Sequence, residues 1–307
     1  MAIRLDKALA TWWNAQDIRF KDTSGRFVGA PIGISALDSI DKLRHPFYGV
    51  IIARNKAGKT AFMLTIAIAM ARSGMVILFN SLEMNLYQMC GRLAANVSRV
   101  DMNQYEHLRA TRSEWERTQK ALEELSRYDF YFTEGKNTAK KLQHEMDGIK
   151  AKYPNRKILV ITDYGQLMTE EEDRGIYRIQ TELSAWMKSQ TLSPNYSEEE
   201  LTAEMMLGLT GDCFSMLTCA QVIVSAKRSG EKVTDASASG TGAWGNDADI
   251  WWLINDVIVN KEPLPNVRDV TMGGRFTGGG IGRIMFTREQ ARFEDYIEPS
   301  AVTEPPM

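Results

Sequence analysis

Apolar residues recur along the chain in two alternating patterns. Short runs that are almost wholly apolar, as at 48–52 and 158–162, are typical of strands buried on both faces of a parallel sheet. Longer stretches with apolar residues three or four positions apart, as at 85–98, are typical of helices that lie on such a sheet. The alternation predicts an α/β fold, a mainly parallel sheet with helices on both faces.

The expected elements can be placed by residue number. Strands are predicted at 48–52, 75–80, 129–133, 158–162 and 215–220, and helices at 60–73, 85–98, 113–127, 138–152 and 175–189. Ser113 and Glu116 match a capping box, which places a helix start there. A second match, Ser197 and Glu200, predicts a helical insertion within 190–212.

The two ends of the chain differ from its middle. After residue 245, strand-like runs at 250–254, 270–272 and 283–287, joined by Gly-rich turns, predict an antiparallel C-terminal extension of the sheet. Residues 299–307, with three prolines, are expected to form a disordered tail. Residues 31–298 are therefore expected to form one ATPase-sized domain.

An amphipathic arm is predicted at 1–30. Leu5, Leu9, Trp12 and Trp13 share one face of a helix, and a polar stretch at 22–29 separates that helix from the body. This face either folds back on the chain's own core or docks on a neighbouring subunit.

Composition narrows the setting and the partners. A net charge of −2 gives no overall attraction to nucleic acid, so any such binding requires a local basic cluster. Cys90, Cys213 and Cys219 lie in or beside apolar stretches without metal-ligand spacing, which favours buried, reduced thiols and a cytoplasmic location. No apolar run approaches the ~18 residues that span a bilayer, so we expect no membrane partner.

The segment between the strand at 48–52 and the helix at 60–73 has the composition of a phosphate-binding loop. Backbone N–H groups at the start of such a helix point at phosphate oxygens, and the helix dipole favours their charge. Lys59 is expected to reach the β- and γ-phosphates and Thr60 to ligate Mg²⁺, although the usual first glycine is replaced by alanine. The sequence thus predicts binding of ATP, or another nucleoside triphosphate, with Mg²⁺ by Ala53, Arg54, Asn55, Lys56, Ala57, Gly58, Lys59 and Thr60.

Two carboxylates are candidates for hydrolysis. Asp163 follows the strand at 158–162, where it would hold the metal together with Thr60. Glu83 follows the strand at 75–80, which we expect beside the phosphate-loop strand, and would act as general base for the attacking water. Ring ATPases of the AAA type place that glutamate directly after the strand-ending aspartate, where this chain has Tyr164.

Two further residues are candidates for sensing and for completing the site. Gln221 ends the strand at 215–220, so it either senses the γ-phosphate or caps a polar strand end. Arg275 lies in the Gly-rich segment 273–278, so it is either an arginine finger for a neighbour's nucleotide, worth ~10³ to 10⁵ in rate, or a solvated turn residue.

Taken together, these residues resemble the helicase domain of DnaB-like replicative helicases and of phage primase-helicases, the superfamily 4 motors with a RecA-like P-loop core. An alanine at the start of the loop is usual in that family. The resemblance is carried by Ala53-Arg54, Gly58-Lys59-Thr60, Ser81-Leu82-Glu83-Met84, Asp163-Tyr164-Gly165-Gln166-Leu167-Met168, Arg275-Phe276-Thr277-Gly278 and Arg292-Phe293-Glu294.

The resemblance implies an ATP-hydrolysing homo-hexameric ring that moves 5′ to 3′ on single-stranded DNA and unwinds duplex at a replication fork. It implies a phage-encoded protein in the host cytoplasm, with a separate primase, polymerase or loader as partner, since no primase domain precedes residue 30. The family's DNA-binding loops correspond to 223–246, where Lys227, Arg228 and Lys232 are the basic residues. Otherwise this segment is a solvated loop with incidental charge.

Two other functions share this core. A RecA-type strand-exchange ATPase would form open filaments on DNA. A non-motor accessory factor would use ATP only to assemble on DNA or on another replication protein.

Overall fold

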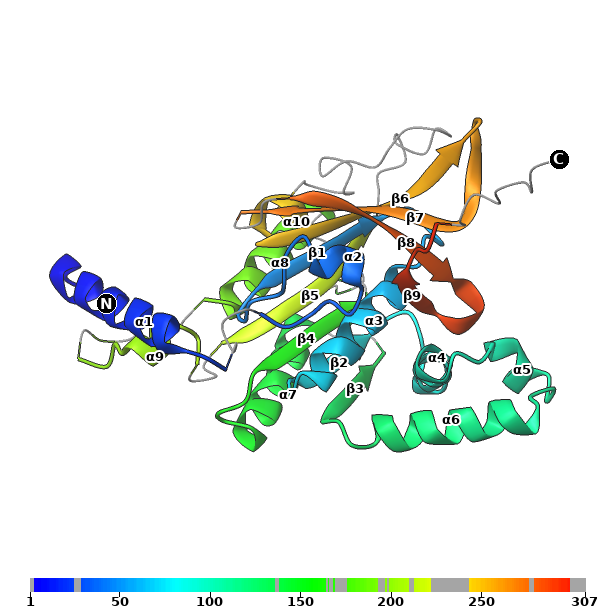
Figure 1. Ribbon diagram of the computed structural model, residues 1–307. Helices are drawn as coiled ribbons and strands as arrows, with labels where there is room; N and C mark the ends of the chain where they lie inside the picture. The colour runs from blue at the N-terminus through cyan, green and yellow to red at the C-terminus, as the bar shows by residue number, and fades with distance from the viewer. Residues whose placement is uncertain are drawn as a thin grey trace.

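The computed structural model describes residues 3–24, 29–135, 138–163, 165, 168, 176–192, 197, 199–209, 213–221, 243–275 and 279–298. Within these residues a nine-stranded sheet has the order β3-β2-β4-β5-β1-β6-β7-β8-β9 (Figure 1). The strands are β1 (Tyr48–Ala53), β2 (Val76–Ser81), β3 (Phe130–Glu134), β4 (Ile158–Asp163), β5 (Phe214–Gln221), β6 (Ile250–Val259), β7 (Glu262–Gly274), β8 (Gly280–Thr287) and β9 (Arg292–Asp295).

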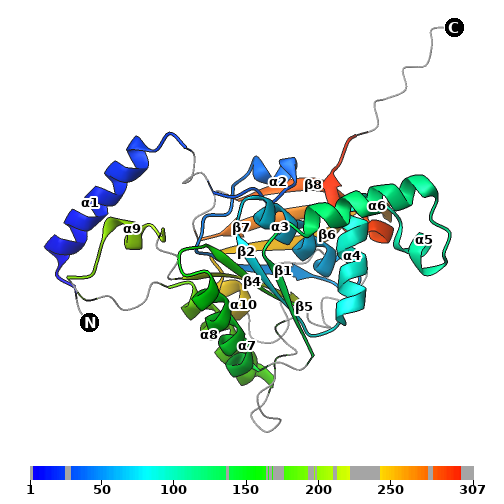
Figure 2. The same ribbon diagram turned by 90° about the horizontal axis from the view of Figure 1, so that it is seen from below.

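Helices cover both faces of the sheet, as the sequence predicts. Figure 2 shows α2, α3 and α4 on one face and α7, α8 and α10 on the other. The described helices are α1 (Leu5–Lys21), α2 (Ser35–Asp38), α3 (Lys59–Arg72), α4 (Leu86–Ser98), α5 (Met102–Glu106), α6 (Arg112–Leu125), α7 (Ala139–Lys152), α8 (Ile176–Gln190), α9 (Ala203–Met206), α10 (Ala243–Asp247) and the 3₁₀ turn η4 (Arg288–Gln290).

The core consists of two apolar clusters, one on each face of the sheet. Neighbouring residues of a strand point to opposite faces, so Ile51 packs in the cluster with α3 and Ile52 in the cluster with α7 and α8. Residues 61–71 of α3 are all buried, because sheet and flanking elements surround this helix. That explains why its sequence is apolar on every side.

Two predicted helix starts need correction. Helix α6 is capped by Thr111, whose hydroxyl accepts from the Glu114 backbone N–H while Glu114 accepts from the Thr111 N–H, so the capping box lies two residues before Ser113. Both pairs fit the same pattern, and sequence alone chose the wrong one. Ser197 and Glu200 do form the reciprocal bonds, but α9 begins only after Thr202, which caps it.

The antiparallel extension begins one strand later than predicted. Strand β6 pairs with β1 in parallel, and only β7, β8 and β9 run antiparallel to their neighbours. The β6–β7 turn uses Asn260 and Lys261, both at positive φ, rather than glycine. This backbone conformation matches the twist of a tight hairpin.

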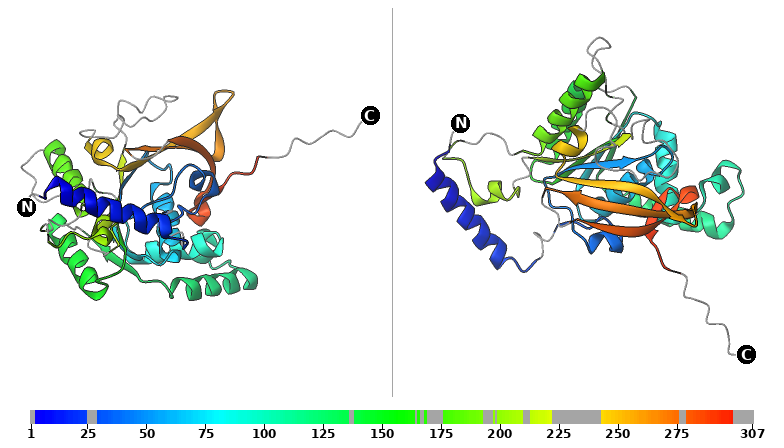
Figure 3. Two further views of the ribbon diagram at one scale, coloured as in Figure 1. Left: turned by 60° about the vertical axis from the view of Figure 1, so that its left-hand side comes forward. Right: turned by 90° about the horizontal axis from the view of Figure 1, so that it is seen from above.

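The N-terminal arm forms helix α1, which lies at the periphery beside α9 (Figure 3). Thr11 and Ala15 are buried, whereas the large apolar side chains of α1 are 50–73% exposed. These side chains do not pack on the chain's own core, as one of the two predicted arrangements required. They are Leu5, Leu9, Trp12 and Trp13.

The remaining predictions from composition have mixed outcomes. Cys213 and Cys219 are buried, but Cys90 is exposed, because it lies on the outward side of α4. Among the described residues, no helix is long and apolar enough to cross a membrane, and no cluster of three or more His, Cys, Asp or Glu side chains suits a metal ion. The predicted tail at 299–307 lies outside the described residues.

Candidate active site

The predicted phosphate loop connects β1 to α3. The chain turns sharply here, with Lys56 at φ 64° and Gly58 at φ 98°, and the Phe62 N–H donates to the Gly58 carbonyl at 2.9 Å to open α3. Gly58 occupies the helix cap position and has no side chain to accept from the first turn. The first-turn N–H groups are thus oriented toward the loop, where they favour an anion.

Lys59 and Thr60 begin α3 and point in different directions. The Lys59 ammonium donates to the Arg54 carbonyl at 3.2 Å, within its own loop. The Thr60 hydroxyl donates to Asp163 Oδ2 at 2.7 Å, which joins the loop to the end of β4. The predicted pairing of Thr60 with Asp163 is therefore present in the fold.

Asp163 is an unusual carboxylate because it is 1% exposed. Burial raises its pKa, the bond from Thr60 and the Cys219 thiol at 3.5 Å oppose that shift, and nearby Glu83 adds to it. A bound cation would favour the ionised form. The Thr60 hydroxyl and the Asp163 carboxylate suit Mg²⁺, which prefers oxygen ligands and takes few of them from protein.

Glu83 lies in the loop between β2 and α4. Strand β2 is separated from β1 by β4 and β5, so the prediction that Glu83 follows the strand beside the phosphate loop is wrong. The register nevertheless pairs Ser81 with Asp163, and the Leu82 N–H donates to the Asp163 carbonyl at 2.9 Å. Glu83 thus lies close to Asp163, and α4 is capped by Asn85 rather than by Glu83.

A cavity of about 690 Å³ contains the loop and both carboxylates. It confirms that Lys59, Thr60, Asp163 and Glu83 face one space. The sequence did not predict four further residues that line it, namely Gln88, Arg92, Phe286 and Arg288. The spacing of Gln88 and Arg92, one helical turn apart and following Glu83, was a usable signal; none marked Arg288.

Aromatic rings support the loop from below. Phe286 of β8 and Phe293 of β9 stack with centroids 4.6 Å apart, and Phe293 meets Phe62 of α3 edge to face at 5.3 Å. A Cβ at Gly58 would lie 2.9 Å from both Phe286 and Phe293. The closing strand, more than 230 residues after the loop, therefore shapes the loop directly.

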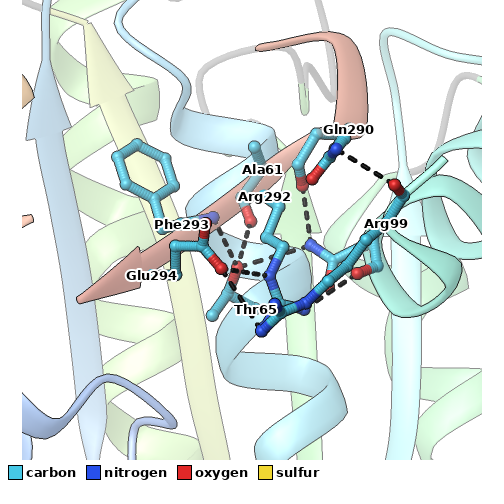
Figure 4. A network of polar contacts seen from close by, with 9 residues as sticks. Ala61, Thr65, Arg99, Gln290, Arg292, Phe293 and Glu294 are labelled. Carbon is cyan, nitrogen blue, oxygen red and sulfur yellow. Dashed lines mark hydrogen bonds and ion pairs between the residues drawn. The ribbon is translucent and has the colours of Figure 1, made fainter. Parts of the chain in front are cut away.

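Polar contacts hold this closing segment against α3 and α4 (Figure 4). The Asn96 amide donates to the Ala291 carbonyl at 2.7 Å, and Arg292 donates to the Asn96 carbonyl at 2.8 Å. Gln290 donates to the Arg99 carbonyl at 3.0 Å, and Arg99 pairs with Glu294 at 3.4 Å. The turn that carries Arg288 is fixed relative to α4 by these bonds.

The other predicted site residues lie elsewhere. Gln221 ends β5 in register with Ala53, at the same edge of the sheet as the loop. Arg275 follows β7, where its guanidinium donates to the Asn246 carbonyl at 2.7 Å, and it lines a different cavity from that of Lys59. Lys227, Arg228 and Lys232 lie outside the described residues.

Comparison with known proteins agrees with this geometry. A family model described as the DnaB-like helicase C-terminal domain matches residues 29–192, just over half of the chain. The replicative DNA helicase DnaB of Nostoc sp. (strain PCC 7120) is 28% identical over 180 residues, which make up 57% of this chain. The match covers only 20% of that relative's length.

Two solved structures have the same fold. One is the ATPase domain of a phage helicase (TM-score 0.78, 20% identity, 97% of this chain and 100% of that chain covered). The other is described as a DnaB-like replicative helicase and its interactions with primase (TM-score 0.78, 21% identity, 96% and 69% covered). The family match, the RecA-like fold and the arrangement of loop and carboxylates agree, and the chain belongs to the DnaB-like helicase C-terminal domain family.

Proposed function

We propose that this chain is an ATP-hydrolysing motor subunit of a replicative DNA helicase. The observation that carries the proposal is the Thr60–Asp163 hydrogen bond at 2.7 Å, in one cavity with Lys59 and Glu83. These four groups are what phosphoryl transfer to water requires: a cation on the phosphates, two oxygen ligands for a metal, and a base for the attacking water. The family assignment supports the same reaction.

Each residue has a distinct task in the proposed reaction. The Lys59 ammonium exchanges the Arg54 carbonyl for β- and γ-phosphate oxygens, and the first-turn N–H groups of α3 hold the same chain of phosphates. Glu83, exposed to the cavity, orients a water molecule and accepts its proton. Mg²⁺, when bound by Thr60 and Asp163, would neutralise charge on the β- and γ-phosphates.

The active site is proposed to be completed by a neighbouring subunit. Arg275 does not line the cavity of its own Lys59 and lies in a solvent-exposed turn, as a finger acting on the next subunit requires. Gln221 lies beside the loop at Ala53 and would report the state of the γ-phosphate to the DNA-binding segment. Lys227, Arg228 and Lys232 would contact the DNA backbone from that segment.

Exposed apolar surfaces support head-to-tail assembly into a homo-hexameric ring. Helix α1 exposes large apolar side chains at one end of the molecule, and α5 and α6 with their connection expose Leu108, Trp115 and Leu122 at the other (Figure 2). Two different surfaces at opposite ends suit a heterologous interface, which repeats around a ring. Translocation is then expected to run 5′ to 3′ along single-stranded DNA, in phage replication, with a separate primase, polymerase or loader.

The reaction can be tested by measuring ATP hydrolysis with and without single-stranded DNA. We expect strong stimulation by DNA, and Glu83→Gln should lower the stimulated rate by ~10² to 10⁴ because the general base is lost. Glu106→Gln, a change at an exposed carboxylate on α5 outside the cavity, is the matched control. A Glu83→Gln rate near wild type would refute the assignment, and negligible turnover by wild type with DNA would favour a non-motor factor.

A further inference from the structure

Arg288 is, among the described residues, an unpaired cation inside the nucleotide cavity. It belongs to the turn η4 directly after β8 and lines the same cavity as Lys59 and Thr60. Within the described part of the chain, its guanidinium has no hydrogen-bond or ion-pair partner, whereas Arg283 on the same hairpin is paired with Asp269 at 2.8 Å. An exposed arginine without an internal partner is available to an anionic ligand.

The support of Arg288 is rigid although its side chain is free among the described residues. The Asn96 amide and the Gln290 side chain bond the residues that follow it to α4, at 2.7 and 3.0 Å (Figure 4). Phe286, two residues before it, packs against the position of Gly58 in the phosphate loop. Because both ends of the turn are fixed, the guanidinium is held over the cavity with little loss of backbone freedom on binding.

The charges that line the cavity call for an anion. Among its described lining residues, two carboxylates, Glu83 and Asp163, face four cationic side chains, so the lining carries an excess of two positive charges. Lys59 accounts for one of the cations at the phosphate loop. The remaining cations that line the cavity are Lys56, Arg92 and Arg288.

Helix α4 shows which end of a nucleotide Arg288 would meet. Glu83 lies just before the start of α4, and Asn96, near its end, bonds the segment behind Arg288. Gln88 and Asn96 are eight residues apart, which is about 12 Å along a helix. The carboxylates that define the hydrolysis end are therefore at one end of the cavity and Arg288 is at the other.

We propose that Arg288 binds the nucleotide of its own subunit at the phosphate nearest the sugar, where a guanidinium can form paired hydrogen bonds to phosphate oxygens. The inference rests on the proposed hydrolysis of ATP in this cavity. Because ATP and ADP both carry this phosphate and it does not react, the contact contributes equally to ground state and transition state. Its loss raises KM and leaves kcat unchanged.

The test compares Arg288→Ala and Arg288→Lys with Glu289→Ala, a change at the exposed neighbour that does not line the cavity. Calorimetric titration with Mg²⁺-ADP and with a non-hydrolysable ATP analogue measures binding, and steady-state hydrolysis gives kcat and KM. We expect Arg288→Ala to weaken both ligands about tenfold and to raise KM alike, with Arg288→Lys intermediate and Glu289→Ala unchanged.

Three results would overturn the proposal. Wild-type affinity in Arg288→Ala would show that the guanidinium does not touch the nucleotide. Weaker binding of the ATP analogue alone, or a fall in kcat at constant KM, would place it at the γ-phosphate. If wild type bound neither nucleotide, the proposed function itself would fail, and this inference with it.

Discussion

Gly58 is the position at which the phosphate loop and the distant closing strand constrain one residue together. Its φ of 98° strains any residue with a Cβ, and that Cβ would approach Phe286 and Phe293 to 2.9 Å. Left-handed backbone costs about 1 to 2 kcal/mol for alanine, and forcing two packed rings apart costs about 1 to 3 kcal/mol. Gly58→Ala is therefore expected to lower the free energy of unfolding by about 2 to 5 kcal/mol.

Gly74→Ala separates the two contributions. Gly74 has a similar φ of 90°, but a Cβ there would meet nothing within 4 Å, so only the backbone cost of about 1 to 2 kcal/mol applies. Denaturant unfolding of wild type and both variants, followed by circular dichroism, measures the difference. Equal destabilisation of Gly58→Ala and Gly74→Ala would refute the proposed contact between the closing strand and the loop.

Three further predictions concern single groups. Burial raises the folded-state pKa of Asp163, so its ionised form opposes folding above that pKa; Asp163→Asn should melt higher than wild type at neutral pH without nucleotide, yet hydrolyse no ATP, and a lower melting temperature would contradict this. Burial, with smaller effects from two nearby lysines, lowers the pKa of His45 to about 3, so stability should fall as pH drops from 6.5 toward 3, and His45→Gln should flatten that fall in acid-unfolding curves. Mixtures of Arg275→Ala and Lys59→Ala subunits should recover some hydrolysis if the arginine acts on a neighbour, and none if it acts within its own subunit.

The parts of this molecule that could be predicted from sequence are those encoded by local patterns. The strand, loop and helix around Lys59 follow one another in the chain, and the fully apolar runs of β1 and β4 identify a buried parallel sheet. Asp163 could be placed because it ends such a run. These predictions required no knowledge of which strands are neighbours.

The errors arose where strand order or distant packing decides the outcome. Strand β2 does not border β1, yet Glu83 still reaches the cavity, because β2 pairs with β4 and brings Ser81 level with Asp163. Arg288 follows the phosphate loop by more than 200 residues, and only the folding of β9 and η4 onto α3 and α4 carries it there. A parallel pairing of β6 with β1 is likewise invisible in the local pattern of β6.

Strand displacement on forked DNA tests the central claim most directly. Purified protein would be incubated with Mg²⁺-ATP and duplexes that carry either a 5′ or a 3′ single-stranded tail on the strand to be tracked, with Lys59→Ala as the inactive control. A ring motor of this family is predicted to release the strand when a 5′ tail is present, and only with hydrolysable nucleotide. DNA-stimulated hydrolysis without displacement from either substrate would contradict the assignment as a helicase motor.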